Sequence, residues 1–214
     1  MIVYDPIGGD AYSKKVTYRP RTCFVITQLG EPVPEPVNKI RRALSKLLKA
    51  KDIKTIDANS AMTGRDFLDK IWGMILSVPL GIAIVTEDMP HNTWANIFYE
   101  VGFMQALGKE TLIVKTVGSR VPSDLVRTEY IDYSALFKTQ VNKYLDKLFE
   151  QAEHYGTMAT ELEQNPLLAI DYLRRAHLIT GDEKYKSRIL DIMIDTSYID
   201  NHSKGIIRDS LCLY

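Results

Sequence analysis

The chain has 214 residues, of which 45% are hydrophobic and 25% are charged. A chain of this length and composition can bury a full core in one domain and still carry an appended segment. Lysine plus arginine and aspartate plus glutamate each number 27, so the formal net charge is zero. Because no block of like charge runs long, the composition disfavours direct nucleic-acid binding.

The positions of the cysteines and histidines indicate the redox compartment and whether a metal site is expected. Cys23 and Cys212 lie at opposite ends of the chain and form no CxxC pair, which favours a reducing compartment, with the cytoplasm as the expected location. The first 20 residues lack the apolar segment of a signal peptide, and no run approaches 18 apolar residues, so no membrane insertion is expected. The four histidines show no metal-ligand spacing, and no metal site is expected.

From Thr22 onward, short apolar runs alternate with segments of helical period, which predicts βαβ units and a parallel sheet. Residues 22–27 (TCFVIT) predict the first strand. Residues 34–50 predict a helix with proline near its first turn, where the missing N–H costs little. One face of this helix is apolar and should pack on the sheet; it carries Val37, Ile40, Leu44, Leu47 and Leu48.

A second βα pair and a central strand follow. Residues 53–57 predict a strand, and Thr63–Asp66 form a variant capping box that opens the next helix. The expected buried face of that helix consists of Phe67, Leu68, Ile71, Trp72 and Ile75. Residues 80–88 (LGIAIVTED) predict a strand that is buried on both faces and ends in three polar residues.

The segment at residues 96–109 (NIFYEVGFMQALGK) has a helical period and contains a single carboxylate, Glu100. The core-facing side of this helix is predicted to carry Trp94, Ile97, Phe98, Val101 and Gln105. Glu100 lies on the flank of that side, in one stripe with Asn96, Phe103 and Leu107. A buried carboxylate is costly unless it is paired, so Glu100 is either half of a structural ion pair or a functional group.

Strands at residues 111–117 and 128–133 complete the predicted α/β fold, a flavodoxin-like parallel sheet of about five strands with flanking helices. A C-terminal helical extension follows, with an amphipathic helix over 135–152 and two helices broken at Thr180–Asp182. We therefore expect an N-terminal segment (1–21), an α/β domain (22–133) and a helical region (134–214). The helical region either covers the sheet, forms a dimer surface or binds a protein partner.

Ligands of open α/β sheets bind outside the carboxyl ends of the strands. This rule selects polar residues that follow the predicted strands: Thr27, Gln28, Gly30, Asn59, Ser60, Glu87, Asp88 and Pro122–Asp124. The chain has no GxGxxG or Walker motif and no GxSxG elbow. The sequence therefore supports neither a dinucleotide fingerprint, nor a P-loop, nor an α/β-hydrolase.

Several local patterns, taken in order, resemble the bacterial TIR-like and nucleoside 2-deoxyribosyltransferase-like nucleotide-binding domains. They are CFVIT-x-x-GE, GRDFLDKIW, IAIVTED, NIFYEVGFMQALGK-x-x-LIV, VPSDL and YIDY, and they span Thr22–Tyr133. The most specific block is NIFYEVG followed by ALGK. The chain departs from the family at Thr27–Gly30, which replaces a Met-Pro-Phe-Gly turn, and in a longer connection between Asp88 and Asn96.

This resemblance implies an N-glycosidase or deoxyribosyltransferase-like enzyme with Glu100 acting at C1′ of the sugar and Asp88 as a second catalytic residue. A carboxylate held where water is scarce would stabilise the oxocarbenium-like centre that forms as the base leaves. The substrate-binding residues that it implies are Thr27, Gln28, Gly30, Arg65, Asp66, Glu87, Asn96, Tyr99 and Asp124. NAD or a nucleoside monophosphate would be a substrate rather than a cofactor. A homo-oligomer and a role in antiviral defence are further expectations.

Two alternatives stay open at this point. The protein could be a nucleotide-sensing module that binds without turnover and signals through its helical tail. It could also be an interaction protein in which Glu100 forms only a core ion pair. A sensing module would bind nucleotide without releasing the base, whereas an enzyme would release it. If Glu100 forms only a core ion pair, Glu100→Gln should destabilise the fold.

Overall fold

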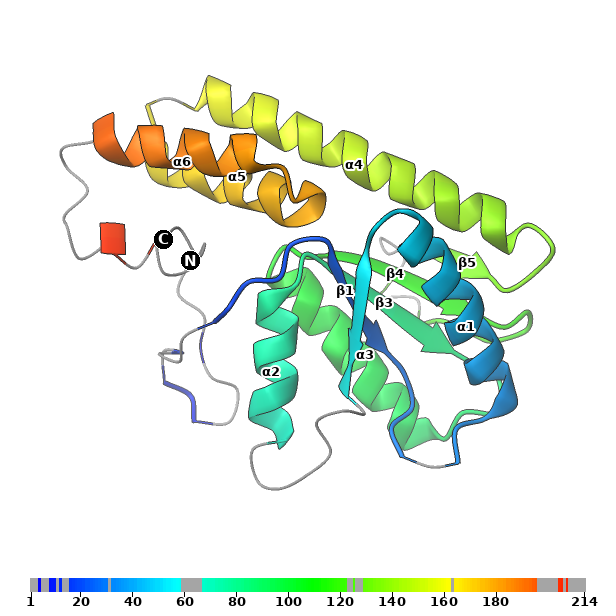
Figure 1. Cartoon of the computed structure of the whole chain (residues 1–214). Coiled ribbons are helices and arrows are strands. Elements are labelled where there is room, and N and C mark those ends of the chain that lie inside the picture. The colour runs from blue at the N-terminus through cyan, green and yellow to red at the C-terminus, as the bar shows by residue number, and fades with distance from the viewer. Residues whose placement is uncertain are drawn as a thin grey trace.

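The computed structural model describes residues 4, 8–10, 12, 16–30, 32–58, 67–122, 125, 129–162, 164–195, 204, 205 and 207. Its centre is a parallel five-stranded sheet in the order β2-β1-β3-β4-β5, shown in Figure 1. The strands are β1 (Thr22–Ile26), β2 (Lys54–Asp57), β3 (Leu80–Val85), β4 (Glu110–Lys115) and β5 (Glu129–Asp132). This is the predicted flavodoxin-like arrangement, in which the strand order reverses between β1 and β3.

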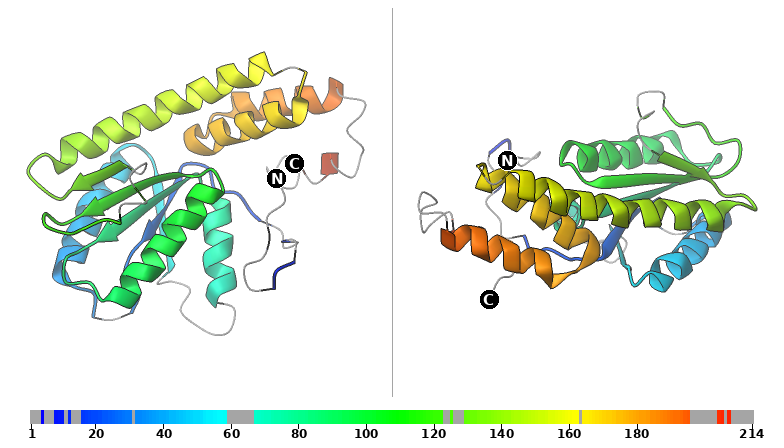
Figure 2. Two further views of the ribbon diagram at one scale, coloured as in Figure 1. Left: turned by 180° about the vertical axis from the view of Figure 1, so that it is seen from behind. Right: turned by 90° about the horizontal axis from the view of Figure 1, so that it is seen from above.

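Helices cover both faces of the sheet, and three of them form the predicted C-terminal extension. They are α1 (Glu35–Ala50), α2 (Phe67–Ser77), α3 (His91–Ala106), α4 (Phe137–Glu161), α5 (Pro166–Thr180) and α6 (Glu183–Asp195). The two further views in Figure 2 show the sheet layered between helices and the extension lying together on one side of it.

Side-chain alternation along β1 shows which helix covers which face. Ile26 and Met104 of α3 both come close to Gly81, so α3 packs on the face that Ile26 points to. Val25 points to the opposite face, where it lines a groove together with Leu44 of α1. Contacts between α2 and α3, and between α1 and α4, complete the two layers.

The structure corrects several details of the predicted elements. Leu68 is 52% exposed, so its predicted place in the core is wrong; Leu76 is buried instead. The reason is that α2 meets α3 one turn further along, where Trp72 contacts Phe103. In α3 the fully buried residue is Met104, whereas the predicted Gln105 is half-buried. The predicted capping box over 63–66 lies outside the described residues.

Two predicted strands are shorter than expected because polar turns end them. β3 stops at Val85, and a turn closes where the Met89 N–H donates to the Thr86 carbonyl at 3.3 Å. β4 begins at Glu110 and stops at Lys115, and the Ser119 N–H then donates to the Thr116 carbonyl at 3.1 Å. The polar residues at these ends therefore lie in turns at the carboxyl edge of the sheet.

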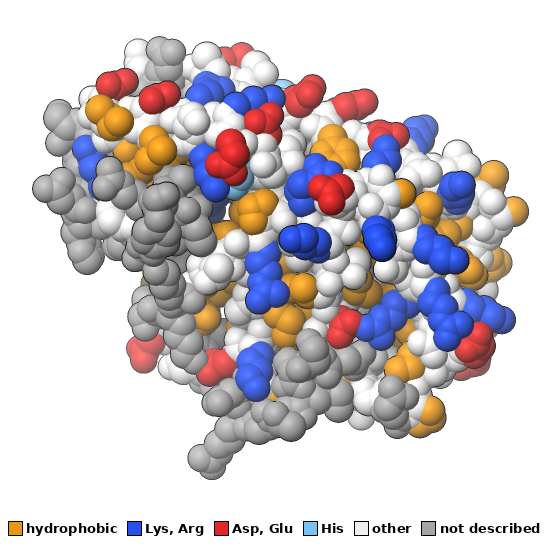
Figure 3. All heavy atoms as spheres, viewed as in Figure 1, with side chains coloured by type: hydrophobic (Ala, Val, Ile, Leu, Met, Phe, Trp, Pro, Cys, Tyr) orange, Lys and Arg blue, Asp and Glu red, His pale blue; other side chains and the backbone are white. Residues whose placement is uncertain are grey.

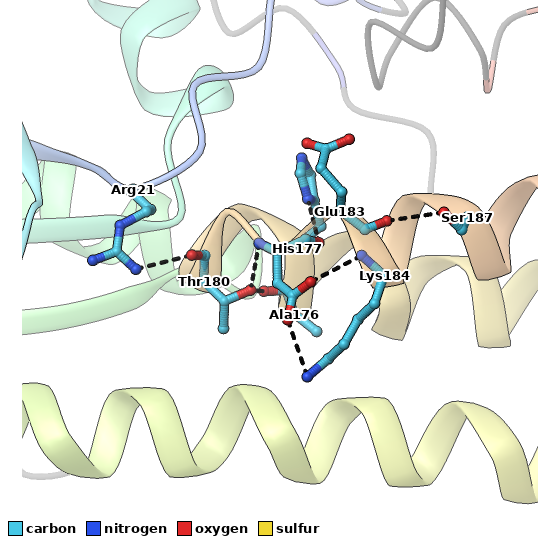
Figure 4. Close-up of polar contacts among 8 residues, drawn as sticks. Arg21, Ala176, His177, Thr180, Glu183, Lys184 and Ser187 are labelled. Carbon is cyan, nitrogen blue, oxygen red and sulfur yellow. Dashed lines mark hydrogen bonds and ion pairs between the residues drawn. The ribbon is translucent and has the colours of Figure 1, made fainter.

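The extension shares one hydrophobic core with the sheet. Buried residues of α4, α5 and α6 belong to the same cluster as those of β1, β3 and β4. Arg21, just before β1, also donates from Nη1 to the Thr180 carbonyl at the end of α5, at 2.9 Å (Figure 4). The His177 ring nitrogen Nδ1 also contacts the Asp182 carbonyl at 3.1 Å across the α5–α6 turn.

The turn between α5 and α6 depends on glycine. Gly181 has a φ of +70° and forms the left-handed C-cap of α5, where its N–H donates to the His177 carbonyl. This was the predicted break at Thr180–Asp182. None of the helices in the described part of the chain is both long enough and apolar enough to span a membrane.

Candidate functional site

Glu100 lies on the flank of α3 that faces α2 and β1. Phe103, three residues further on, contacts Trp72 of α2. Gln105, five residues further on, donates from Nε2 to Thr111 Oγ1 of β4 at 3.0 Å. At about 100° per residue these contacts turn Glu100 toward the α2 side and away from β4. Since β1 adjoins β3 on the side away from β4, Glu100 flanks the point where the strand order reverses.

The Glu100 side chain is half-buried and forms no hydrogen bond or ion pair within the described part of the chain. Burial alone raises the pKa of its carboxyl group from 4.5 to about 7. A structural ion pair would have lowered this pKa, because a neighbouring cation favours the charged form. The described residues therefore give no support to the ion-pair hypothesis, and they leave an acid that is partly ionised near neutral pH.

Two polar side chains at the end of β1 also lack partners. Thr27 is 6% exposed and Gln28 is half-buried, yet Thr27 Oγ1 and Gln28 Oε1 are buried and have no hydrogen-bond partner among the described residues. Both residues follow directly after Ile26, the last residue of β1. Gly30, with a φ of +89°, then turns the chain. Buried polar groups without partners are candidates for ligand contact.

The two carboxylates after β3 lie in an exposed turn, and Glu87 faces away from Glu100. A Cβ on Gly118 would lie 3.2 Å from Glu87 Oε2, so this carboxylate rests over the loop that follows β4. The Glu87 N–H also donates to Thr116 Oγ1 at 3.2 Å. Asp88 is exposed beside it, at the carboxyl edge of the sheet. Glu87 is thus directed to the β4 side, whereas Glu100 is directed to the β1 side.

The remaining predicted residues divide between the outer surface of α3 and segments that the structure does not describe. Asn96 is exposed one turn before Glu100, and Tyr99 is 60% exposed. Arg65, Asp66 and Asp124, predicted to bind substrate, lie outside the described residues.

Trp94 is a candidate that the sequence assigned only to the core. It is half-buried in the first turn of α3, packs edge-on against Phe98, and has a buried indole Nε1 that finds no hydrogen-bond partner within the described part of the chain. Its helical position turns it toward β4, so it lies on the other side of α3 from Glu100. The available signal was the residue type, because a buried tryptophan always carries an N–H that needs an acceptor.

No three His, Cys, Asp or Glu side chains gather closely enough to hold a metal ion among the residues described. The candidate groups are therefore a protonatable carboxyl on α3, an amide oxygen after β1, and exposed acids and amides. Such a set suits recognition of hydroxyl and N–H groups and stabilisation of a developing cation.

No protein-family model matches the sequence, and no curated protein matches it. Among solved structures, the chain is similar to the Clostridium botulinum CMP N-glycosidase BcmB, with a TM-score of 0.42 and 19% sequence identity. The match covers 57% of this chain and 98% of that chain. A likeness this weak supports no argument about the site.

Proposed function

We propose that this protein cleaves the N-glycosidic bond of a nucleotide or nucleoside, with Glu100 facing C1′ of the sugar. The observation that carries the proposal is the half-buried Glu100 carboxyl on α3, which has no partner among the described residues and a pKa raised to about 7. The helix that carries it begins at the carboxyl ends of the strands, where open α/β sheets bind their ligands. The motif resemblance of residues 96–109 supports the same role for Glu100.

The proposed reaction breaks the bond between C1′ and the base nitrogen, and the bonding electron pair leaves with the base. The ionised Glu100 stabilises the positive charge that develops at C1′, either through space or by forming a bond to it. Water then adds to C1′, its proton goes to the departed base, and the sugar is released with any phosphate groups that it carries; a second base in place of water would give transfer instead. Asp88, the second proposed catalytic residue, is proposed to hydrogen-bond the leaving base or the sugar.

Substrate recognition is proposed for the polar groups around Glu100. Gln28 Oε1, which has no partner among the residues that the structure describes, can accept a hydrogen bond from a sugar hydroxyl or from an N–H of the base. Asn96, one helical turn before Glu100, can contact the sugar from the exposed side. NAD and nucleoside monophosphates are the proposed substrates, and no cofactor is required for this chemistry.

The test is a mass-spectrometric screen for base release from NAD, nucleosides and nucleoside monophosphates. Glu100→Gln keeps the shape of the side chain but removes its charge, and should lower the rate by at least about 100-fold. Glu153→Gln is the matched control, because Glu153 is an exposed carboxylate on α4, outside the proposed site. Equal base release by Glu100→Gln and wild type would contradict the proposal. Saturable binding of intact nucleotide would favour the sensing module instead.

The pH dependence of the rate separates two roles for Glu100. A carboxylate that stabilises C1′ must be ionised, so kcat/KM should rise with pH to a midpoint at about 7 and then level off. A profile that instead falls through this midpoint would mean that Glu100 acts as the proton donor. Rates should be measured between about pH 5 and 9, the range that brackets this titration.

A further inference from the structure

A groove of about 440 Å³ lies between the outer flank of α1 and the edge strand β2. Its floor is apolar and formed by Val25 and Leu44, and its rim carries Arg41, Arg42 and Lys46. Val25 points to the sheet face opposite Ile26, so this groove and Glu100 lie on opposite faces of the sheet. The groove is therefore separate from the site proposed for glycosidic cleavage.

Two of the three cations of the groove have no acidic partner among the described residues. Arg41 pairs with Asp57 at the end of β2. Arg42 and Lys46 are exposed, and neither forms an ion pair or hydrogen bond with any residue that the structure describes. Two hydroxyl groups, from Ser45 of α1 and Thr55 of β2, line the same space. An anion in the groove would thus meet unpaired positive charge and additional hydrogen-bond donors.

Positive charge is concentrated in residues 35–57 of a chain whose net charge is zero. Residues 35–57 contain seven lysines and arginines and three acidic residues, a net charge of +4, so the rest of the chain carries −4. Figure 3 shows the Lys and Arg side chains gathered over α1. An ordinary solvated helix face mixes both signs at spacings of three or four residues. On α1 the described face carries cations at 39, 42, 46 and 49 without intervening acids.

We propose that this groove binds a phosphorylated small molecule of nucleotide size at a site distinct from Glu100. The phosphate groups would contact Arg42 and Lys46, since guanidinium and ammonium groups match phosphate oxygens. The apolar floor would take the uncharged part of the ligand, and Asp57 can accept a hydrogen bond from a hydroxyl or N–H group. The cavity volume falls within the range of small-molecule sites. A nucleic acid fits less well, because Arg42 and Lys46, the two groove cations without an acidic partner among the described residues, lie one turn apart on a single helix.

Titration calorimetry with inorganic pyrophosphate tests the site, because pyrophosphate contains no glycosidic bond. We expect saturable binding by the full chain and a loss of at least about tenfold in affinity for the double variant Arg42→Glu, Lys46→Glu. Lys138→Glu, Lys143→Glu is the matched control: both lysines are exposed on α4, and the change in net charge is the same. Glu100→Gln should bind pyrophosphate as wild type does, so failure at this groove and failure of the proposed function are distinguishable.

Three results would overturn the proposal. The first is the absence of saturable pyrophosphate binding up to about 10 mM, a concentration above which affinity is too weak to be specific. The second is an equal loss of affinity in the groove variant and in the α4 control, which would reduce the effect to net charge. The third is preferential binding of a single-stranded oligonucleotide over pyrophosphate, lost in the groove variant, which would make the face a nucleic-acid surface.

Discussion

Glu100 is an acid whose folded environment favours the protonated form. Its pKa is about 7 in the folded protein and 4.5 in the absence of burial. Between these two values the folded state holds more protons than the unfolded state, so the free energy of unfolding falls as pH rises from about 4.5 to 7. By this linkage the ionised carboxylate costs the fold up to roughly 3 kcal/mol above pH 7.

Glu100→Gln should therefore stabilise the protein in a pH-dependent manner. Near pH 8 the variant should gain about 2–3 kcal/mol in unfolding free energy over wild type, and near pH 4.5 the difference should vanish. Urea denaturation at several pH values measures it, with Glu153→Gln as the control that changes little at any pH. A loss of stability at pH 8 would mean that a cation partner, absent among the described residues, pairs with Glu100.

For single residues, the sequence selected candidates for the site but did not predict the direction of their side chains or their hydrogen-bond partners. A single carboxylate in an apolar helix identified Glu100, and the end of a predicted strand identified Gln28, because both signals are local. The sequence placed Glu87 among the substrate-binding residues without showing that it faces the β4 side, since the direction of an exposed side chain depends on the turn and the neighbouring strand. It also placed Trp94 only in the core, because periodicity does not report whether an indole N–H finds an acceptor.

Among the elements, the junction of α5 with the sheet depends on one arginine. Arg21 donates from Nε to the Asp52 carbonyl at 3.0 Å and from Nη1 to the Thr180 carbonyl at 2.9 Å, and Nη2 contacts the Lys51 carbonyl. Its guanidinium also lies 5.3 Å from the ring centre of Phe149 on α4. One side chain therefore joins the start of β1 to the α1–β2 turn, α4 and α5.

Arg21→Ala should remove these contacts and lower the unfolding free energy by about 2–3 kcal/mol, because three carbonyl groups lose a charged donor. Arg19→Ala is the matched control: the Arg19 side chain is exposed, and its loss should cost less than about 0.5 kcal/mol. Chemical denaturation of the two variants in parallel provides the comparison. Similar small losses in both would show that packing, rather than Arg21, holds the junction.

Helices and strands were predictable where the apolar residues form an unbroken run or a regular stripe. The apolar runs of β1 and β3 and the apolar stripe of α1 gave correct strands and a correct helix, since their periods match their secondary structure. Leu68 was assigned wrongly because the pattern shows which side of a helix is apolar but not where along its length a neighbour begins to cover it. Strand ends were overextended by polar residues that belong to turns.

At the scale of the whole molecule, the extension and the sheet bury their residues in one cluster. Ile189 of α6 and Ile82 of β3 are both fully buried members of it. The sequence predicted separate regions over 22–133 and 134–214, and that boundary stays a prediction. A continuous core nevertheless favours cooperative unfolding of the two regions, because exposing either surface also exposes its counterpart.

Both tryptophans, Trp72 and Trp94, lie in the α/β part, so tryptophan fluorescence reports on that part, whereas far-UV circular dichroism also reports on the long helices of the extension. We expect the two thermal transitions to coincide within about 2 °C. Ile189→Ala creates a cavity beside α6. It should lower the free energy of unfolding by about 2–4 kcal/mol and lower both midpoints equally. If the fluorescence midpoint stayed at its wild-type value while the dichroism midpoint fell, the extension would unfold on its own. Equal shifts would mean that a change in α6 is felt at the sheet, which is the physical requirement for a helical tail that could transmit ligand binding.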